Sequence, residues 1–480
     1  MIDRAFGLAT DLYELTMAAA YFENRLQNTR AIFELFVRRL PARRSFLIVA
    51  GLQQALDYLA GLRFTSEQID YLREHPTFKS VSGEFFDYLA EFRFTGDVFA
   101  MPEGTAAFGM EPLMRVTAPI IEAQVVETFL LSTINFQTMI ASKAARVVSA
   151  ADGRAVIEFG TRRAHGSEAG LFAARGAFIG GCEGTSNVEA GYLFGIPTFG
   201  TLAHSFVMSF EDEDEAFRAF LQVFPETATV LVDTYDTIAA VKRLARDFGP
   251  NIPAVRLDSG DLCGLSKEVR KILDEAGMSS TKIFASGDLN EYKIADLISH
   301  GAKIDSFGVG TELATSFDAP ALSGVYKLAG LVENGHLSMR IKLSQDKATY
   351  PGAKQVWRRN DDNGRYLQDI ITLTDEPHNQ TGSWHPLLTQ AIKQGRVLDS
   401  FAPLPTDLQS QTRFSEARFA CLNEARDRAR DQLSRLPDSL LELDSKARFP
   451  VVFSEQLVKE KENLEQQIVG MQEARNERPD

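Results

Sequence analysis

Short apolar runs alternate with amphipathic stretches through the middle of the chain, and this pattern predicts alternating strands and helices. Strand-like runs occupy residues 155–159, 197–201, 229–232, 253–257, 282–285 and 304–307. Stretches with apolar residues three or four apart predict helices at 167–178, 212–223, 237–248, 266–276 and 291–300. Such a chain folds into a parallel sheet or barrel, so we predict an α/β unit over 151–330. With 325–328 as a candidate seventh strand, an incomplete, seven-stranded α/β barrel is favoured over an open sheet.

The flanking regions show other patterns. Residues 1–150 begin with a helical pattern from Asp11, continue with a strand at 31–37 and a helix at 47–62, and then break into short runs separated by glycine and proline. This predicts an N-terminal α+β, sandwich-like domain over 1–150, completed by strands within about 330–400. Residues 401–480, rich in Arg, Glu, Asp and Leu, predict a charged helical C-terminal segment with a solvated face.

Composition and charge exclude several classes of protein. The chain has 480 residues, of which 44% are hydrophobic and 24% are charged, as in ordinary globular proteins rather than disordered or fibrous ones. The net charge of −14 argues against a broad nucleic-acid interface. A local basic cluster at Arg38, Arg39, Arg43 and Arg44 could still bind a small anion.

The cysteines and the apolar segments indicate a cytoplasmic protein without a membrane partner. Cys182, Cys263 and Cys421 are far apart and have no metal-ligand spacing, so we expect free thiols. The first residues lack the basic and apolar regions of a secretory signal. No uninterrupted apolar stretch reaches the roughly 20 residues that a membrane-spanning helix needs.

Polar residues follow the C-terminal end of each strand-like run. In order they are Arg162 with Arg163, His204, Asp233 with Asp236, Asp258 with Asp261, Asp288, and the run Gly308-Val309-Gly310-Thr311. Parallel α/β proteins place their active sites where the strands end, so we expect these residues to share one site. The glycines of the last run would let backbone N–H groups approach a phosphate, although a tight strand-to-helix turn has the same sequence.

Arg256 and Asp258 are the strongest candidates. In an extended strand both side chains point to the same side, so both could face one ligand. The arginine could clamp a phosphate, while the carboxylate could accept hydrogen bonds from ribose hydroxyls or support a developing sugar cation. The alternative is an internal ion pair that ends the strand.

The remaining candidates each have a structural alternative. His204 could accept a phosphoryl group as a neutral imidazole, or serve as a structural hydrogen-bonding residue. Arg162 and Arg163 could bind an anion or lie in a solvated turn. Asp288 could bind ribose hydroxyls or cap the helix that follows. Tyr13 could stack on a heteroaromatic ring or pack in the core. Together these residues indicate an enzyme that acts on a phosphorylated sugar, with the reaction left open.

Several motifs, in order over most of the chain, resemble those of the nicotinate phosphoribosyltransferase family. They are Thr10-Asp-Leu-Tyr-Glu-Leu-Thr-Met17, Glu158-Phe-Gly-Thr-Arg-Arg-Ala164, Gly184-Thr-Ser-Asn187, Gly200-Thr-Leu-Ala-His-Ser205, Arg256-Leu-Asp-Ser-Gly-Asp261, Phe307-Gly-Val-Gly-Thr311, Gly324-Val-Tyr-Lys-Leu328 and Pro351-Gly-Ala-Lys-Gln355. The resemblance implies a type II phosphoribosyltransferase that joins nicotinate to phosphoribosyl pyrophosphate. It also implies Mg²⁺, coupled ATP hydrolysis of the ligase type and a homodimer with shared active sites.

The resemblance also implies roles for single residues. His204 would be phosphorylated by ATP, and Asp258 and Asp288 would hold ribose hydroxyls. Arg162, with Arg163 beside it, and Arg256 would hold phosphates or the nicotinate carboxylate. Phe159, together with Tyr13 of a partner subunit, would sandwich the pyridine ring. The rest of the substrate site would comprise Thr201, Gly308, Gly310 and Thr311.

Other activities stay open at this point. Nicotinamide- and quinolinate-using enzymes share the architecture, and the pair of arginines favours a carboxylate over an amide. The phosphoribosyl pyrophosphate loop of type I enzymes is absent, since residues 232–236 echo it only superficially. An aldolase or isomerase would need a lysine or an enolising carboxylate at a strand end, and no such lysine is evident. A non-enzymatic sugar-phosphate sensor would not need His204.

Overall fold

The computed structural model describes residues 5–250, 252–333, 335–344, 348–376, 383–401 and 411–476, without the side chains of 411–418 and 474–476. The chain divides into two compact units. Unit 1 comprises Met1–Thr138, Ala321–Thr406 and Asp431–Asp480, and unit 2 comprises Met139–Pro320 and Asp407–Arg430. Among the described residues, no helix is long and apolar enough to cross a membrane.

Unit 2 is built on a six-stranded sheet in which every neighbouring pair of strands is parallel. The strand order is β7-β6-β11-β10-β9-β8. Its elements are β6 (Ala155–Glu158), η2 (Thr161–Arg163), α7 (Ser167–Ile179), β7 (Gly184–Thr185), α8 (Val188–Phe194), α9 (His204–Val207), α10 (Glu213–Val223), β8 (Thr229–Leu231), α11 (Thr237–Asp247), β9 (Ala254–Leu257), α12 (Leu262–Glu275), β10 (Lys282–Ala285), α13 (Glu291–Ser299), β11 (Ser306–Val309) and α14 (Thr311–Ala314). Helix α6 (Glu127–Ala150) enters unit 2 from unit 1.

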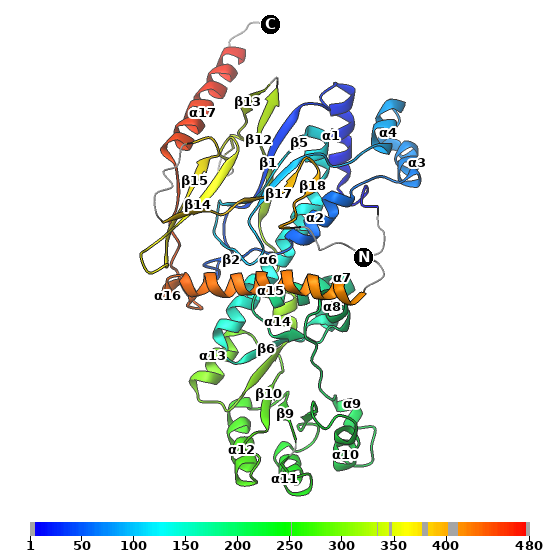
Figure 1. Cartoon of the computed structure of the whole chain (residues 1–480), viewed down its shortest axis with the longest axis vertical. Coiled ribbons are helices and arrows are strands. Elements are labelled where there is room, and N and C mark those ends of the chain that lie inside the picture. The colour runs from blue at the N-terminus through cyan, green and yellow to red at the C-terminus, as the bar shows by residue number, and fades with distance from the viewer. Residues whose placement is uncertain are drawn as a thin grey trace. The chain divides into compact units, whose positions relative to one another are not determined.

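The strands of unit 2 have two to four residues each, and most of their residues are buried. In β10 and β11 the last three residues of each strand are buried. Helices α11, α12 and α13 lie outside strands β9 and β10 (Figure 1). Each begins at a polar cap whose side chain accepts a backbone N–H, namely Asp236, Asp261 and Asn290. The strand ends and helix starts therefore meet at one edge and carry its polar residues.

Two predicted strands of the barrel are not strands of this sheet. Residues 197–201 make only an isolated parallel bridge between Thr198 and Thr185, because their remaining backbone runs as a loop. Residues 325–328 belong to β12 (Gly324–Glu333) of unit 1, where they pair antiparallel with β1 (Arg30–Val37). A strand that prediction missed, β7, has only two residues, too few for a periodic pattern. The coarser prediction of a parallel α/β fold is confirmed.

Unit 1 holds antiparallel strands and helices. Its seven-stranded sheet has the order β13-β12-β1-β5-β3-β17-β18. Strand β1 lies between β12 and β5 and is buried at every position after its first. A four-stranded sheet has the order β16-β14-β15-β19, and β2 pairs with β4. The other elements are α1 (Leu12–Glu23), β2 (Leu47–Ile48), α2 (Leu52–Gly61), α3 (Ser66–Glu74), η1 (Pro76–Phe78), α4 (Gly83–Ala90), β3 (Asp97–Ala100), β4 (Ala106–Ala107), β5 (Pro112–Pro119), α5 (Ile120–Val125), β13 (His336–Met339), β14 (Lys354–Asn360), β15 (Tyr366–Leu373), β16 (Trp384–Pro386), β17 (Thr389–Lys393), β18 (Arg396–Val397), α16 (Asp438–Leu441), β19 (Val451–Phe453) and α17 (Glu455–Asn476).

The C-terminal segment was predicted to be helical, but it also contains a strand. Helices α15 (Gln411–Arg435), α16 and α17 do form, but β19 lies between them and pairs in parallel with β15. Just before β19, the ring of Phe449 stacks on Phe108 with the centroids 4.2 Å apart. This strand was not predicted because it has only three residues within a segment rich in charged residues.

Candidate active site

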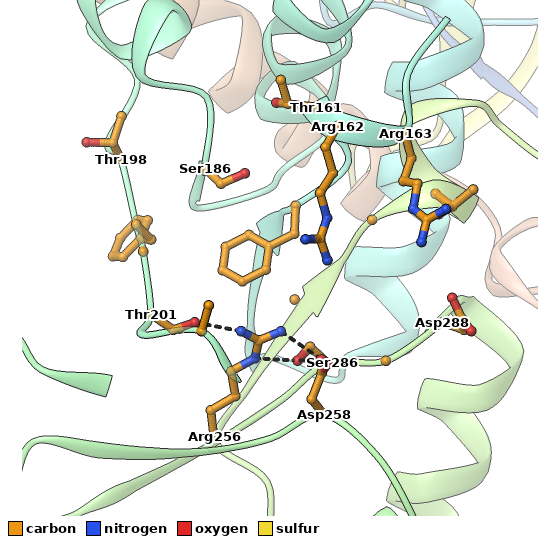
Figure 2. Close-up of a pocket in the computed structure, with 18 of the residues that line it drawn as sticks. Thr161, Arg162, Arg163, Ser186, Thr198, Thr201, Arg256, Asp258, Ser286 and Asp288 are labelled. Carbon is orange, nitrogen blue, oxygen red and sulfur yellow. Dashed lines mark hydrogen bonds and ion pairs between the residues drawn. The ribbon is translucent and has the colours of Figure 1, made fainter. Parts of the chain in front are cut away.

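A pocket with a volume of about 800 Å³ lies at the C-terminal ends of the strands of unit 2. Figure 2 shows its side chains converging from the loops that follow the strands. The lining residues are Phe159, Thr161, Arg162, Arg163, Ser186, Val188, Thr198, Phe199, Gly200, Thr201, Ala203, Arg256, Asp258, Ser286, Gly287, Asp288, Gly308, Gly310 and Thr311. They come from loops that are far apart in the sequence, as expected for a parallel sheet.

The guanidinium group of Arg256 ties three of these loops together. It donates to Thr201 Oγ1 at 2.6 Å, to Ser286 Oγ at 2.8 Å and to Asp258 Oδ1 at 2.7 Å. Ser286 Oγ in turn donates to Asp258 Oδ1 at 2.6 Å. Figure 2 shows this network on the floor of the pocket. Because each bond uses a different donor of a rigid planar group, the network fixes the three loops relative to one another.

The network keeps Asp258 ionised. Burial by itself would raise the pKa of this carboxyl group, but the hydrogen bond from Ser286 and the positive charge of Arg256 hold the pKa below its usual value. The internal ion pair that sequence reasoning raised as an alternative is therefore present, and both partners also line the pocket. A carboxylate at this position can face a ligand with its second oxygen.

His204 lies beside Asp258, although it is not among the lining residues. Its Nε2 atom is 3.9 Å from Asp258 Oδ2, and its Nδ1 atom is 3.1 Å from the hydroxyl of Thr234. The side chain is 43% exposed, which does not fit a buried structural histidine. Asp233 accepts hydrogen bonds from the backbone N–H of Asp258 at 3.0 Å and from Ser259 Oγ at 2.6 Å, and so fixes the loop that carries Asp258.

Two glycines allow close approaches that no larger residue would permit. A Cβ on Gly308 would lie 2.9 Å from the ring of Phe159 and 2.7 Å from that of Phe284, so this glycine makes room for Phe159 in the pocket. Gly287 has a φ of +101°, and a Cβ there would lie 2.0 Å from the carbonyl oxygen of Asp258. The chain can therefore turn directly over the Asp258 loop only with glycine at this position.

Buried Glu158 anchors the loop that carries the two arginines. Its carboxylate accepts hydrogen bonds from the backbone N–H of Gly160 and, at 2.6 Å, from Thr185 Oγ1. Burial raises the pKa of Glu158, while these two hydrogen bonds lower it. From this loop Arg162 and Arg163 point into the pocket, with Arg163 on the side of Asp288 (Figure 2).

Ten of the twelve residues predicted for the site line one pocket, and His204 lies beside it. Tyr13 is the exception, since it lies on α1 of unit 1 with 48% of its surface exposed. The alternative role of Asp288 is excluded, because Asn290 caps α13 by accepting the N–H of Lys293 at 3.0 Å. Prediction assigned no role to Ser286, although it directly precedes Gly287 at a predicted strand end.

Family models match most of the chain. A model of the nicotinate phosphoribosyltransferase N-terminal domain matches residues 8–135, a model of the nicotinate phosphoribosyltransferase family matches 155–370, and a model of the C-terminal domain matches 353–461. All but one of the predicted site residues lie inside the second of these matches, and Tyr13 lies inside the first.

Individual proteins agree with the family models. Nicotinate phosphoribosyltransferase pncB2 of Mycobacterium tuberculosis is 46% identical over 462 residues, which are 95% of this chain and 93% of that protein. The Bacillus subtilis nicotinate phosphoribosyltransferase is 42% identical over 399 residues, 81% of each chain. The crystal structure of human nicotinic acid phosphoribosyltransferase is similar with a TM-score of 0.80 and 29% identity, covering 95% of this chain and 99% of that one.

The close approach at Gly287 predicts a large effect of one added methyl group. Gly287→Ala should lower the free energy of unfolding by about 1–3 kcal/mol more than Gly277→Ala, because the new Cβ must displace the backbone of Asp258. Gly277 is a matched control: its φ is +75°, but a Cβ there meets no described atom within 4 Å. Urea unfolding of both variants measures the difference. Equal losses would mean that only the backbone conformation matters at Gly287.

Proposed function

Because the chain belongs to the nicotinate phosphoribosyltransferase family, we propose that it joins nicotinate to phosphoribosyl pyrophosphate, giving nicotinate mononucleotide and pyrophosphate. The product would serve NAD biosynthesis by salvage. The main structural support is that Asp258, Asp288, three arginines and the glycine run converge on one pocket with Phe159 at its side. The extended segment at 197–202 would take the place of a seventh strand. It bridges Thr185, and Leu202 donates to the carbonyl of Thr229 at 3.4 Å.

The proposed reaction is a displacement at C1 of the ribose. The ring nitrogen of nicotinate attacks C1 with its own lone pair, and the bond from C1 to the pyrophosphate oxygen breaks, so no general base is needed. Positive charge develops on the sugar, and the ionised Asp258 would stabilise it, while Asp258 and Asp288 hold the ribose hydroxyls. Phe159 would orient the pyridine ring, so that the attack starts from a positioned complex.

Two different sets of anion-binding groups in the pocket would fix the direction of binding. Arg162 would pair with the nicotinate carboxylate, with Arg163 and Arg256 beside it for carboxylate or phosphate oxygens. The glycines at 308 and 310 and Thr311, on the loop beside that of Arg162, would hold the 5′-phosphate through backbone N–H groups at the start of α14. Thr201 would complete the site through its hydrogen bond to Arg256.

The carboxylates of the pocket also fit the Mg²⁺ ion that the family implies. No group of three or more acidic, histidine or cysteine side chains suited to a metal occurs among the described residues. Mg²⁺ is commonly held by one or two carboxylates together with substrate phosphates, and Asp258 and Asp288 would serve in this way. When bound, the ion supplies positive charge to the leaving pyrophosphate.

We further propose that ATP hydrolysis is coupled to the reaction through a phosphohistidine at His204. The exposed ring and the neighbouring Asp258 support this role, since a phosphate on Nε2 would place new negative charge beside the sugar site. A homodimer with shared sites is proposed as well, in which Tyr13 of one protomer closes on the pyridine ring in its partner. Tyr13 is exposed on α1, so its phenol ring is available for such a contact.

Substrate choice tests the proposed reaction. With phosphoribosyl pyrophosphate and Mg²⁺, kcat/KM should be about 100-fold or more higher for nicotinate than for nicotinamide, because an amide would leave a guanidinium unpaired. Arg162→Gln should reduce this preference, whereas Arg246→Gln, which changes an exposed arginine of α11 paired with Asp247, should not. A preference for nicotinamide or quinolinate would contradict the proposed function.

The histidine variant separates a phosphate acceptor from a structural residue. His204→Ala should abolish nicotinate-stimulated ATP hydrolysis but spare slow, ATP-independent transfer, because the sugar-phosphate residues are unchanged. The wild type should carry an acid-labile, base-stable phosphate after ATP treatment. His300→Ala, at an exposed histidine that ends α13, is the control. Intact ATP coupling in His204→Ala would rule out the phosphohistidine.

Hybrid dimers test the role of Tyr13. If this ring completes the site of a partner, Tyr13→Ala and Asp258→Ala chains should each be inactive alone, while their mixture should regain up to about a quarter of the wild-type activity per site through hybrid dimers. Mixed activity is measured after co-refolding or co-expression. An active protein that stays monomeric at the assay concentration would exclude a shared site.

A further inference from the structure

A buried cluster of charges in unit 2 includes residues that directly follow two loops of the pocket. Lys143 on α6 is 1% exposed, and its Nζ atom lies 2.6 Å from Glu291 Oε2, 2.9 Å from Asp318 Oδ1 and 3.7 Å from Glu312 Oε2. One turn along the helix, Arg146 Nε contacts the other oxygen of Glu291 at 3.2 Å. All five residues belong to unit 2.

The carboxylates of this cluster are attached to the two loops that the proposed function assigns to the sugar phosphate. Glu291 is the first residue of α13, three residues after Asp288. Glu312 directly follows Thr311 at the start of α14. One buried ammonium group therefore contacts the residues that follow both loops, and it does so from the side of the core.

Burial makes this arrangement restrictive. An ammonium group taken out of water is tolerated only while its carboxylate partners stay in place, and each carboxylate likewise requires the cation. Displacement of the Glu291 loop would break a fully buried ion pair, and displacement of the Glu312 loop would remove a further, 22% exposed partner of the same ammonium group. The shared cation therefore opposes separation of the two loops. Lys143 also neutralises Glu312, whose charge would otherwise repel a phosphate bound at the adjacent Thr311.

We propose that Lys143 is a positioning residue that sets the affinity for phosphoribosyl pyrophosphate, with Glu291 and Glu312 as its links to the pocket. This inference rests on the proposed function, because it takes the two loops as the sugar-phosphate site. The loop that carries Arg162 has an anchor of its own, because Glu158 holds it through Thr185 and Gly160. The effect of Lys143 should therefore fall mainly on phosphoribosyl pyrophosphate.

The test compares the two substrates in Lys143→Met. The KM for phosphoribosyl pyrophosphate and its Kd by calorimetry with Mg²⁺ should rise roughly tenfold, because small displacements of binding groups cost affinity steeply, while the KM for nicotinate changes less than twofold. Adding Glu312→Gln to this variant should recover part of the loss by removing the unneutralised carboxylate. If Lys143→Met fails to fold, Glu291→Gln replaces it, because this variant keeps the shape of the side chain and leaves Lys143 in place. It should likewise raise the KM for phosphoribosyl pyrophosphate much more than the KM for nicotinate.

A matched control lies in unit 1. Lys354 is also buried, with its Nζ 2.7 Å from Glu34 Oε2. Lys354→Met should therefore lower the melting temperature without changing the KM for one substrate more than the KM for the other. If Lys143→Met or Glu291→Gln lowers the melting temperature but shifts both constants equally, or leaves the phosphoribosyl pyrophosphate constants unchanged, the positioning role is wrong. A wild-type protein that binds no phosphoribosyl pyrophosphate would instead overturn the proposed function.

Discussion

The hydrogen-bonded network of Arg256, Ser286 and Asp258 is the interaction on which the pocket depends. Arg256 is only 13% exposed, so its charge must be balanced and its donors must be satisfied within the protein. The partners that meet this need come from three separate loops, at Thr201, Ser286 and Asp258. The requirement to pair one buried guanidinium thus determines where three loops of unit 2 must lie.

Other features of the site follow from this constraint. The network keeps Asp258 ionised, and the carboxylate in turn lies 3.9 Å from Nε2 of His204. Gly287 must be a glycine because the Ser286 loop passes directly over the carbonyl of Asp258. Glu158 and Lys143 then anchor further loops of the pocket from the buried side. Polar residues thereby hold loops that the short strands alone could not position.

The strands and site residues that could be predicted from the sequence are those marked by a pattern within a few neighbouring residues. Strands β6, β8, β9, β10 and β11 were predictable because each is a short apolar run, and the polar residues at their ends followed from the geometry of parallel sheets. The segment at 197–201 has the same local pattern but forms only one bridge, because pairing depends on the position of the neighbouring strands and not on the segment's own sequence. The role of Ser286 was missed for the same reason, because its partners Arg256 and Asp258 are distant in sequence. Strand β7 was missed because two residues form no periodic pattern.

The cluster around Lys143 illustrates this limit further. In sequence, Lys143 is one charged residue on a helix, and Glu291 and Glu312 read as ordinary residues in the first turn of two helices. Nothing local indicates that they meet at 2.6–3.7 Å in the core. Buried charge clusters of this kind depend on tertiary packing, whereas the family motifs that carry the pocket are contiguous in sequence.

A crystal structure with bound nicotinate mononucleotide tests the account most directly, because it shows all the proposed contacts at once. The account predicts the pyridine ring against Phe159 with its carboxylate toward Arg162, the ribose hydroxyls within hydrogen-bond distance of Asp258 and Asp288, and the phosphate at residues 308–311. A nucleotide bound outside this pocket, or bound in the reverse direction with its phosphate at Arg162, would contradict it.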